Sequence, residues 1–417
     1  MMLAVLAIGL VLVVFARRGV DVFSMALAGV VFYYYPILAF DNIVWLSEGV
    51  ASSSVDSLAA LVMFFIVVVY AVWAYFLPLY SAEKISFSGE KVLVLLRVSF
   101  VVCVVFSIVL LYKGRVYGGG SKVDLMAAIT YELKIYESAA TVYFICAHVL
   151  GGNLRRVIGV VFAVIALYIG FRFLVMSLVI SYFIVRPVRN RKGVIYSGLG
   201  IFFVAVLSVV SKMFFYEIPD INMIGVILEG QLKGDDFFQN ISIANAESSS
   251  VSVVFNEVLK NDFRVGFGYW VGVLISLIPA ASVFGLGGVD GFADIYKSSL
   301  SVEGVETFAG SMFALGYAAF GYFGIILFVL AHLISMYFGY RFVFGRFSTY
   351  FKVFVLYFLV IAIFFGHRND VIYNISLIKS VLGIVLGCVF WDVFLRAYFG
   401  PGAVSKWVGL DENRLPH

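Results

Sequence analysis

Apolar runs long enough to cross a lipid bilayer recur along the whole sequence. A transmembrane helix needs about 20 mostly apolar residues, and fewer where flanking charged groups reach the headgroups. On this rule the sequence predicts about eleven spans. They are residues 1–16, 22–40, 58–79, 92–112, 137–151, 157–171, 172–186, 194–214, 314–340, 352–366 and 371–395. Hydrophobic residues make up 63% of the 417 and charged residues 13%, a composition that excludes a soluble domain. The predicted fold class is therefore an all-α polytopic membrane protein.

Residues 157–186 are predicted to form two short helices instead of one long helix. Arg155 and Arg156 precede them and a cationic cluster at 186–192 follows them. Short cationic loops stay in the cytoplasm, and a single span would place the two clusters on opposite sides of the membrane. A helical hairpin keeps both clusters inside and places Arg172 at the outer turn, away from the middle of the bilayer where a charge is costly. The N-terminus is then outside and the C-terminus inside.

Residues 215–313 are predicted to form one large outer loop. The segment contains twelve acidic residues and only four basic ones, the deficit of cations that a translocated loop shows. Its apolar stretch 251–284 predicts helices that lie in or dip into the outer interface. The predicted organisation has four parts. They are an N-terminal bundle of eight helices over 1–214, the outer loop over 215–313, three helices over 314–395 and a cytoplasmic tail over 396–417.

Several classes of function are excluded by what the sequence lacks. It contains no Walker A, HExxH, GxSxG or paired CxxC motif. The net charge of +4 is small and scattered, so no nucleic-acid partner is expected. No DxD or ExD triplet occurs in a predicted outer loop, although close carboxylates often hold the divalent metal of glycosyl transfer. We therefore expect no metal and no cofactor, and any phosphate chemistry would depend on cationic side chains.

Four cations next to the bilayer on the predicted outer face are candidates for binding a phosphate. They are Arg172, Lys212, Arg264 and Arg368. An arginine can pair bidentately with phosphate oxygens, and each charge-assisted bond contributes about 1.5–3 kcal/mol. Each candidate has a structural alternative. Arg172, in YIGFRFLV, can extend to lipid headgroups, and Arg264 can instead be the partner of Asp262 or Glu257.

Four residues on the predicted outer face are candidates for a general base. They are Glu257, Asp262, His367 and Asp370. His367 and Asp370 belong to the turn HRND between the last two spans, where Arg368 also lies. The alternative for this turn is a set of polar residues that satisfy one another. His148 and His332 lie on apolar spans and are predicted to be hydrogen-bonded structural residues. The sequence does not choose among the base candidates.

Several features follow one another in a particular order. Two short helices with an outer arginine, VIALYIGFRFLVMSLVI, precede a cationic inner loop and one more helix. The large outer loop follows, with its apolar segment ending in LISLIP, and then the run GSMFALGYAAFGYFGIILF and the turn HRND. This order resembles the Wzy family of O-antigen and capsule repeat-unit polymerases. Leu315 stands where many relatives carry an acidic residue.

The resemblance implies a GT-C-like fold in the bacterial inner membrane, with the N-terminus periplasmic and the C-terminus cytoplasmic. It implies a glycosyltransferase that moves a glycan from one polyprenyl-diphosphate-linked oligosaccharide to the non-reducing end of another, releasing polyprenyl diphosphate. Arg172 and Arg368 are then expected to converge on that diphosphate. Membrane lipids and a chain-length regulator protein are the further partners.

Two alternatives to a polymerase stay open. One is an O-antigen ligase-like transferase within the same group. The other, from a different class, is a transporter or flippase that moves the lipid-linked oligosaccharide without chemistry. A flippase is expected to line a path across the membrane with polar groups, which most of these spans lack at mid-depth.

Overall fold

The computed structural model describes most of the predicted helices. The described residues are 1–46, 50–79, 86–117, 122–168, 171, 173–190, 192–198, 200, 246–278, 291–292, 295–296, 310–368 and 371–400. The chain divides into two compact units. Unit 1 contains Met1–Leu79, Val188–Tyr337 and Ile361–Ile375, and unit 2 contains Tyr80–Pro187, Phe338–Val360 and Ser376–His417.

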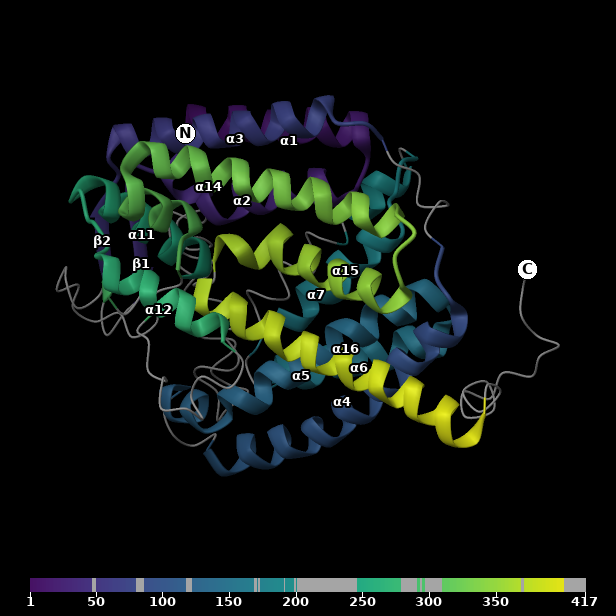
Figure 1. Ribbon diagram of the computed structural model, residues 1–417. Helices are drawn as coiled ribbons and strands as arrows, with labels where there is room; N and C mark the ends of the chain where they lie inside the picture. Colours follow the sequence, from purple (N-terminus) through teal and green to yellow (C-terminus); the bar gives the residue numbers. More distant parts are fainter. Residues whose placement is uncertain are drawn as a thin grey trace, which may run out of the picture. The chain divides into compact units, whose positions relative to one another are not determined.

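Six described helices are long and apolar enough to cross a membrane. They are α2 (Val22–Ala39), α3 (Ser57–Phe76), α4 (Gly89–Tyr117), α14 (Met312–Phe344), α15 (Thr349–Phe364) and α16 (Val371–Phe399) (Figure 1). Four others coincide with predicted spans but are shorter or carry more charge. They are α1 (Met2–Arg18), α5 (Lys122–Leu150), α6 (Asn153–Tyr168) and α7 (Phe173–Val185). The chain is therefore a mainly α-helical, multi-pass membrane protein. The predicted span 194–214 lies largely outside the described residues.

The predicted division of residues 157–186 into two helices is confirmed. Helix α6 ends at Tyr168, α7 begins at Phe173, and the two helices contact each other. Arg172 itself lies outside the described residues, so its expected place at the outer turn stays a prediction.

A two-stranded antiparallel sheet, which was not predicted from the sequence, occupies the first predicted outer loop. Strand β1 (Asn42–Leu46) pairs with β2 (Val50–Ser54), and Ile43 lies opposite Ser53. The β-branched and aromatic residues of NIVWL favour a strand, whereas VASSS gives a weak signal. Helix α11 (Ala246–Lys260) packs against β1 and supplies a contact that the local sequence does not reveal.

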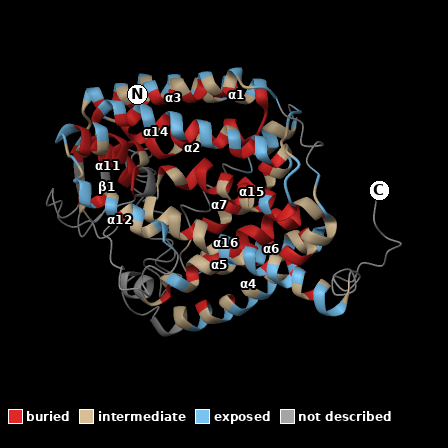
Figure 2. Ribbon diagram, in the orientation of Figure 1, coloured by how far each residue is buried: buried red, intermediate tan, exposed pale blue. Residues whose placement is uncertain are grey.

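Helix α2 is largely enclosed within unit 1, with 78% of its residues buried. Figure 2 colours the described residues by burial. It contacts α1, α3 and α11. Its first turn is capped by Asp21, whose carboxylate accepts hydrogen bonds from the backbone N–H groups of Phe23 and Ser24. The buried Arg18 pairs with Asp21 and donates to the carbonyls of Ala74 and Leu77 at the end of α3. One guanidinium therefore joins the ends of α1, α2 and α3.

The described part of the predicted outer loop contains two helices of different character. Helix α11 packs against α2, α3 and β1 and is buried on several sides, so it does not lie exposed along an interface. The buried serines of α11 can satisfy their hydroxyls by hydrogen bonds within the protein. The Ser252 hydroxyl, for example, donates to the Tyr33 carbonyl at 3.0 Å. Helix α12 (Phe267–Leu277) exposes Phe267, Val271 and Leu274, which share one helical face. That face suits the predicted interfacial position.

Helix α14 covers the predicted span 314–340, and it contains a break that was not predicted. The break lies at Phe320 (φ −140°, ψ 18°) and Gly321 (φ 66°, ψ −150°), and glycine adopts a positive φ without steric cost. Gly316 and Gly324 meet across the break. A Cβ atom on Gly324 would lie 1.9 Å from the Gly316 carbonyl oxygen. The absence of side chains at these two positions lets the two segments touch backbone to backbone.

Unit 2 contains α4, α5, α6 and α7 with most of α15 and α16. Helices α4 and α5 pack against each other, and Lys113 and Glu132 join them through an ion pair of 2.6 Å. On α16, Arg396 pairs with Asp392 at 2.8 Å and with Glu90 of α4 at 2.9 Å. The Lys113 and Glu90 ion pairs connect helices within unit 2, and the Asp392 pair lies within α16. The described members of the predicted site belong to unit 1.

Candidate functional site

Five of the eight predicted site residues are described, and all five lie in unit 1. They are Glu257, Asp262, Arg264, His367 and Arg368. Arg172, Lys212 and Asp370 lie outside the described residues, so the expected convergence of Arg172 and Arg368 stays a prediction.

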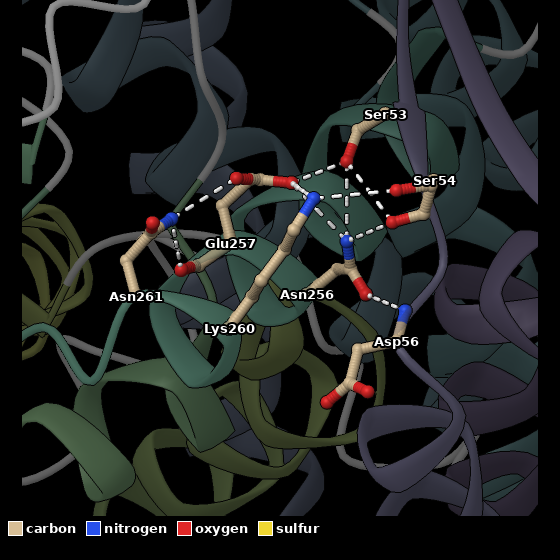
Figure 3. Close-up of polar contacts among 7 residues, drawn as sticks. All are labelled: Ser53, Ser54, Asp56, Asn256, Glu257, Lys260 and Asn261. Carbon is tan, nitrogen blue, oxygen red and sulfur yellow. Dashed lines mark hydrogen bonds and ion pairs between the residues drawn. The ribbon is translucent and has the colours of Figure 1, made fainter.

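A polar cluster forms around Glu257, where hydrogen bonds join the end of β2 to α11 (Figure 3). The Ser53 hydroxyl donates to Glu257 Oε1, and the Asn256 amide donates to the same oxygen at 3.2 Å. The Asn261 amide donates to Oε2 at 3.1 Å. The Lys260 ammonium lies 4.0 Å from Oε1. Both oxygens of this carboxylate therefore have donors that fix its orientation.

The cluster exists because α11 is fixed to the end of the β-hairpin by Asn256. This fully buried side chain donates to the Ser54 carbonyl at 3.0 Å and accepts from the Asp56 backbone N–H at 2.8 Å. Residues 257, 260 and 261 are three and four positions apart, so they share one face of the helix end. The Glu257 side chain is 18% exposed and that of Lys260 is 44% exposed. Glu257 is thus held firmly and still reaches the molecular surface, as a group that exchanges a proton with a substrate must.

Arg264 is bound to the break in α14. The carbonyls at the end of a helical segment need donors from elsewhere. Arg264 Nη1 donates to the Tyr317 carbonyl at 2.9 Å, and the backbone N–H of Val265 donates to the Ala318 carbonyl at 3.0 Å. The guanidinium lies over Gly321, where a Cβ atom would be 2.9 Å from Nη1. The connection between α11 and α12 is thereby tied to α14.

Asp262 completes this contact. Its Oδ1 accepts hydrogen bonds from the Tyr317 hydroxyl at 2.9 Å and from Arg264 Nη2 at 2.7 Å. The bond from Tyr317, followed by the bond and charge of Arg264, lowers the pKa of Asp262 below its ordinary value of 3.8. A carboxylate held in its ionised form is a weak base. Of the alternatives for Arg264, pairing with Asp262 is confirmed, whereas its role toward a phosphate stays a prediction.

The Asp262 contacts predict a stability difference that depends on pH. Because the pKa of Asp262 is lowered on folding, its contribution is present above the ordinary value of 3.8 and is lost as the pH falls through the folded pKa. Asp262→Asn removes the charge, and asparagine tolerates the positive φ of 45° at this position. The unfolding midpoint of the purified protein should therefore be lower for Asp262→Asn at pH 7, and the difference should shrink below about pH 4. A difference that is constant from pH 7 to pH 3 would contradict this role.

His367 is fully buried in a cluster of aromatic and histidine rings. Its ring centroid lies 4.9 Å from that of His332, 5.5 Å from that of Phe313 and 6.0 Å from that of Tyr70. His332 is hydrogen-bonded to the Tyr70 hydroxyl and to the Ala362 carbonyl, as predicted for a structural histidine. Neither ring nitrogen of His367 has a hydrogen-bond partner among the described residues. In this conformation His367 has no exposed surface through which to meet a substrate.

Tyr34 of α2 connects the histidine cluster to α11. Its ring lies 5.7 Å from that of Phe255 and 5.5 Å from that of Phe313, measured between centroids. Its hydroxyl is 2.8 Å from the Ser311 hydroxyl, in a buried hydrogen bond. The polar cluster around Glu257 and the histidine cluster are therefore joined by packed side chains within unit 1.

Ser53 and Asn256 are members of the site that were not predicted from the sequence. Ser53 lies in a run of three serines in the first predicted outer loop, and a serine run by itself indicates no chemistry. Asn256 precedes Glu257 directly, and this pair of polar residues within an apolar segment was the signal that could have identified it.

Arg368 follows the short 3₁₀ helix Phe365–His367 and is half-buried.

Comparisons with protein-family models, with curated proteins and with solved structures find no match for this chain.

Proposed function

We propose that this protein is a glycosyltransferase that polymerises polyprenyl-diphosphate-linked oligosaccharide repeat units at the periplasmic face of the bacterial inner membrane. The observation that carries the proposal is Glu257, an oriented and partly exposed carboxylate between two segments that sequence analysis assigns to the outer face. The order of sequence features that resembles the Wzy family supports it. The proposal includes about eleven spans, a GT-C-like fold, a periplasmic N-terminus and a cytoplasmic C-terminus.

In the proposed reaction, a sugar hydroxyl of the acceptor attacks the anomeric carbon of the donor glycan. The bond from that carbon to the diphosphate oxygen breaks, and the electron pair leaves with polyprenyl diphosphate. Glu257 takes the hydroxyl proton as general base. Among the other base candidates, Asp262 is held ionised by Tyr317 and Arg264, and His367 is buried. Glu257 is therefore the base that the described geometry favours.

The leaving diphosphate gains negative charge at the membrane surface, and fixed cations can stabilise it. Arg264 is 46% exposed, and its pairing with Asp262 and the Tyr317 carbonyl holds it in place. We assign the diphosphate to Arg264 and Arg368, and retain Arg172 and Lys212 as further candidates from the sequence. Chemistry of this kind does not require a metal, because the arginines supply the positive charge.

The proposal predicts chain elongation by the purified protein without added metal. The full chain is reconstituted in proteoliposomes with a synthetic polyprenyl-diphosphate-linked repeat unit and excess chelator. We expect longer glycans, with one polyprenyl diphosphate released for each new glycosidic bond, measured by mass spectrometry. Loss of activity in chelator that magnesium or manganese restores would contradict metal independence.

The same assay separates the alternatives. Transfer to lipid A, with none to a second lipid-linked unit, would identify a ligase and overturn the polymerase proposal. Movement of the lipid-linked unit across the bilayer without a new glycosidic bond would identify a transporter.

A further inference from the structure

The carboxylate of Glu257 is held by donors from two different parts of the chain. Asn256 and Asn261 lie on the same helix end as Glu257, so they move with it. Ser53 lies on β2, 204 positions earlier in the sequence, and donates to Oε1 from across the contact. Among the described residues, the Ser53 hydroxyl is the donor that fixes this carboxylate relative to the hairpin.

We infer that Ser53 is a positioning residue, which holds Glu257 in the orientation that accepts the proton of the acceptor hydroxyl. The inference rests on the proposed function. Ser53 occupies Oε1 together with the Asn256 amide, whereas Oε2 receives the Asn261 amide near the exposed helix end. Oε2 is therefore the oxygen that faces the acceptor, and Ser53 sets its direction by holding the other oxygen.

The docking of α11 on the hairpin does not depend on the Ser53 hydroxyl alone. The Asn256 amide donates to the Ser53 hydroxyl at 3.2 Å, but it also donates to the Ser54 carbonyl, and its oxygen accepts from the Asp56 N–H. The last two bonds survive a change at position 53. Removing the Ser53 hydroxyl therefore releases the Glu257 carboxylate from the hairpin, while α11 stays attached to β2 and the bonds from Asn256 and Asn261 remain. A positioning role and a folding role can thus be separated by experiment.

The test compares Ser53→Ala, Ser53→Thr and the matched control Ser54→Ala in the proteoliposome assay. The Ser54 hydroxyl accepts from Lys260 and does not contact Glu257 in the structure. Because misplacing a reacting group by about 1 Å can cost on the order of 100-fold in rate, we expect Ser53→Ala to lower kcat about 10- to 100-fold with little change in KM. Ser53→Thr retains the hydroxyl and should recover much of the rate, and Ser54→Ala should match the wild type.

The split between kcat and KM, together with rescue by threonine, provides a readout that a merely structural role would not move. A misplaced base slows the chemical step and leaves substrate binding unchanged, so Ser53→Ala should lower kcat and not raise KM. Threonine at this position should restore kcat. The unfolding midpoint of all three variants is measured in parallel.

Three outcomes would overturn the inference. Wild-type kcat in Ser53→Ala would show that Ser53 does not position the base. Equal losses in Ser53→Ala and Ser54→Ala would indicate general damage to the hairpin. A wild-type protein that forms no glycosidic bond would refute the proposed function, and the inference with it, whereas an active wild type with a normal Ser53→Ala variant would refute the inference alone.

Discussion

Replacing Gly324 by alanine should destabilise the protein by about 3 kcal/mol or more, because the new methyl group has no room. Its Cβ would lie 1.9 Å from the Gly316 carbonyl oxygen and 2.8 Å from the carbonyl carbon. Both are backbone atoms, which cannot turn away as a flexible side chain can. The two segments of α14 would have to separate, and the contacts of Arg264 and Val265 with the Tyr317 and Ala318 carbonyls would be strained.

The measurement is the unfolding midpoint of detergent-solubilised protein, followed by fluorescence-detected size exclusion. Gly387→Ala is the matched control, because a methyl group on this exposed glycine of α16 would meet nothing within 4 Å. Alanine there should be neutral or stabilise the helix by up to about 1 kcal/mol. A Gly324→Ala variant as stable as the wild type would refute the close approach of Gly316 and Gly324.

Glu257→Gln should lower the rate of chain elongation about 100- to 10,000-fold, the usual contribution of a general base. Glutamine has nearly the same shape as glutamate, but its amide cannot take the acceptor's proton. Ser53 and Asn261 both donate hydrogen bonds to the native carboxylate. The NH2 group of glutamine is itself a donor, so it would face one of these two donors in place of an acceptor oxygen. Elongation is measured as glycosidic bonds formed per minute in proteoliposomes.

Asp41→Asn is the matched control for Glu257→Gln. It makes the same acid-to-amide change just before β1, on an exposed residue whose described bond to Val55 uses the backbone. The control should elongate chains at the wild-type rate. Wild-type elongation by Glu257→Gln would remove Glu257 from the reaction and leave Ser53 without a base to position.

The membrane-spanning helices could be predicted from the sequence because their signal is local. Lipid requires every backbone polar group to bond within its own helix, so a span is recognisable from its own residues. The division of α6 and α7 followed from charge, since the cationic clusters on both sides had to stay on one face. No distant contact was needed for either conclusion.

The hairpin and the break in α14 depend on distant contacts, and the sequence did not reveal them. Strand β2 has the weak sequence VASSS, and its place is fixed by Asn256, about 200 positions away. Gly321 was visible as part of a glycine-aromatic run, but glycine is common in membrane helices and does not by itself indicate a break. Arg264 bound to the Tyr317 carbonyl is what distinguishes this glycine.

The candidate site was predicted in part for the same reason. Glu257 could be named because an acid in an apolar outer segment is conspicuous in the sequence. The choice among four base candidates required burial and partners, which are properties of the folded chain. Ser53 could not be named at all, since nothing in the sequence connects positions 53 and 257 before α11 meets β2.

The bonds of Arg264 and Val265 to the broken turn of α14 limit how this protein can be recombined with others. A chimaera that received residues 246–278 from a different parent would keep the Tyr317 and Ala318 carbonyls but lose their donors unless the new segment supplied them. Conversely, a transplanted α14 with an unbroken helix would offer Arg264 no carbonyl to bind. The segments 262–265 and 316–324 therefore depend on each other. A chimaera that is designed to exchange substrate specificity should take both segments from the same parent.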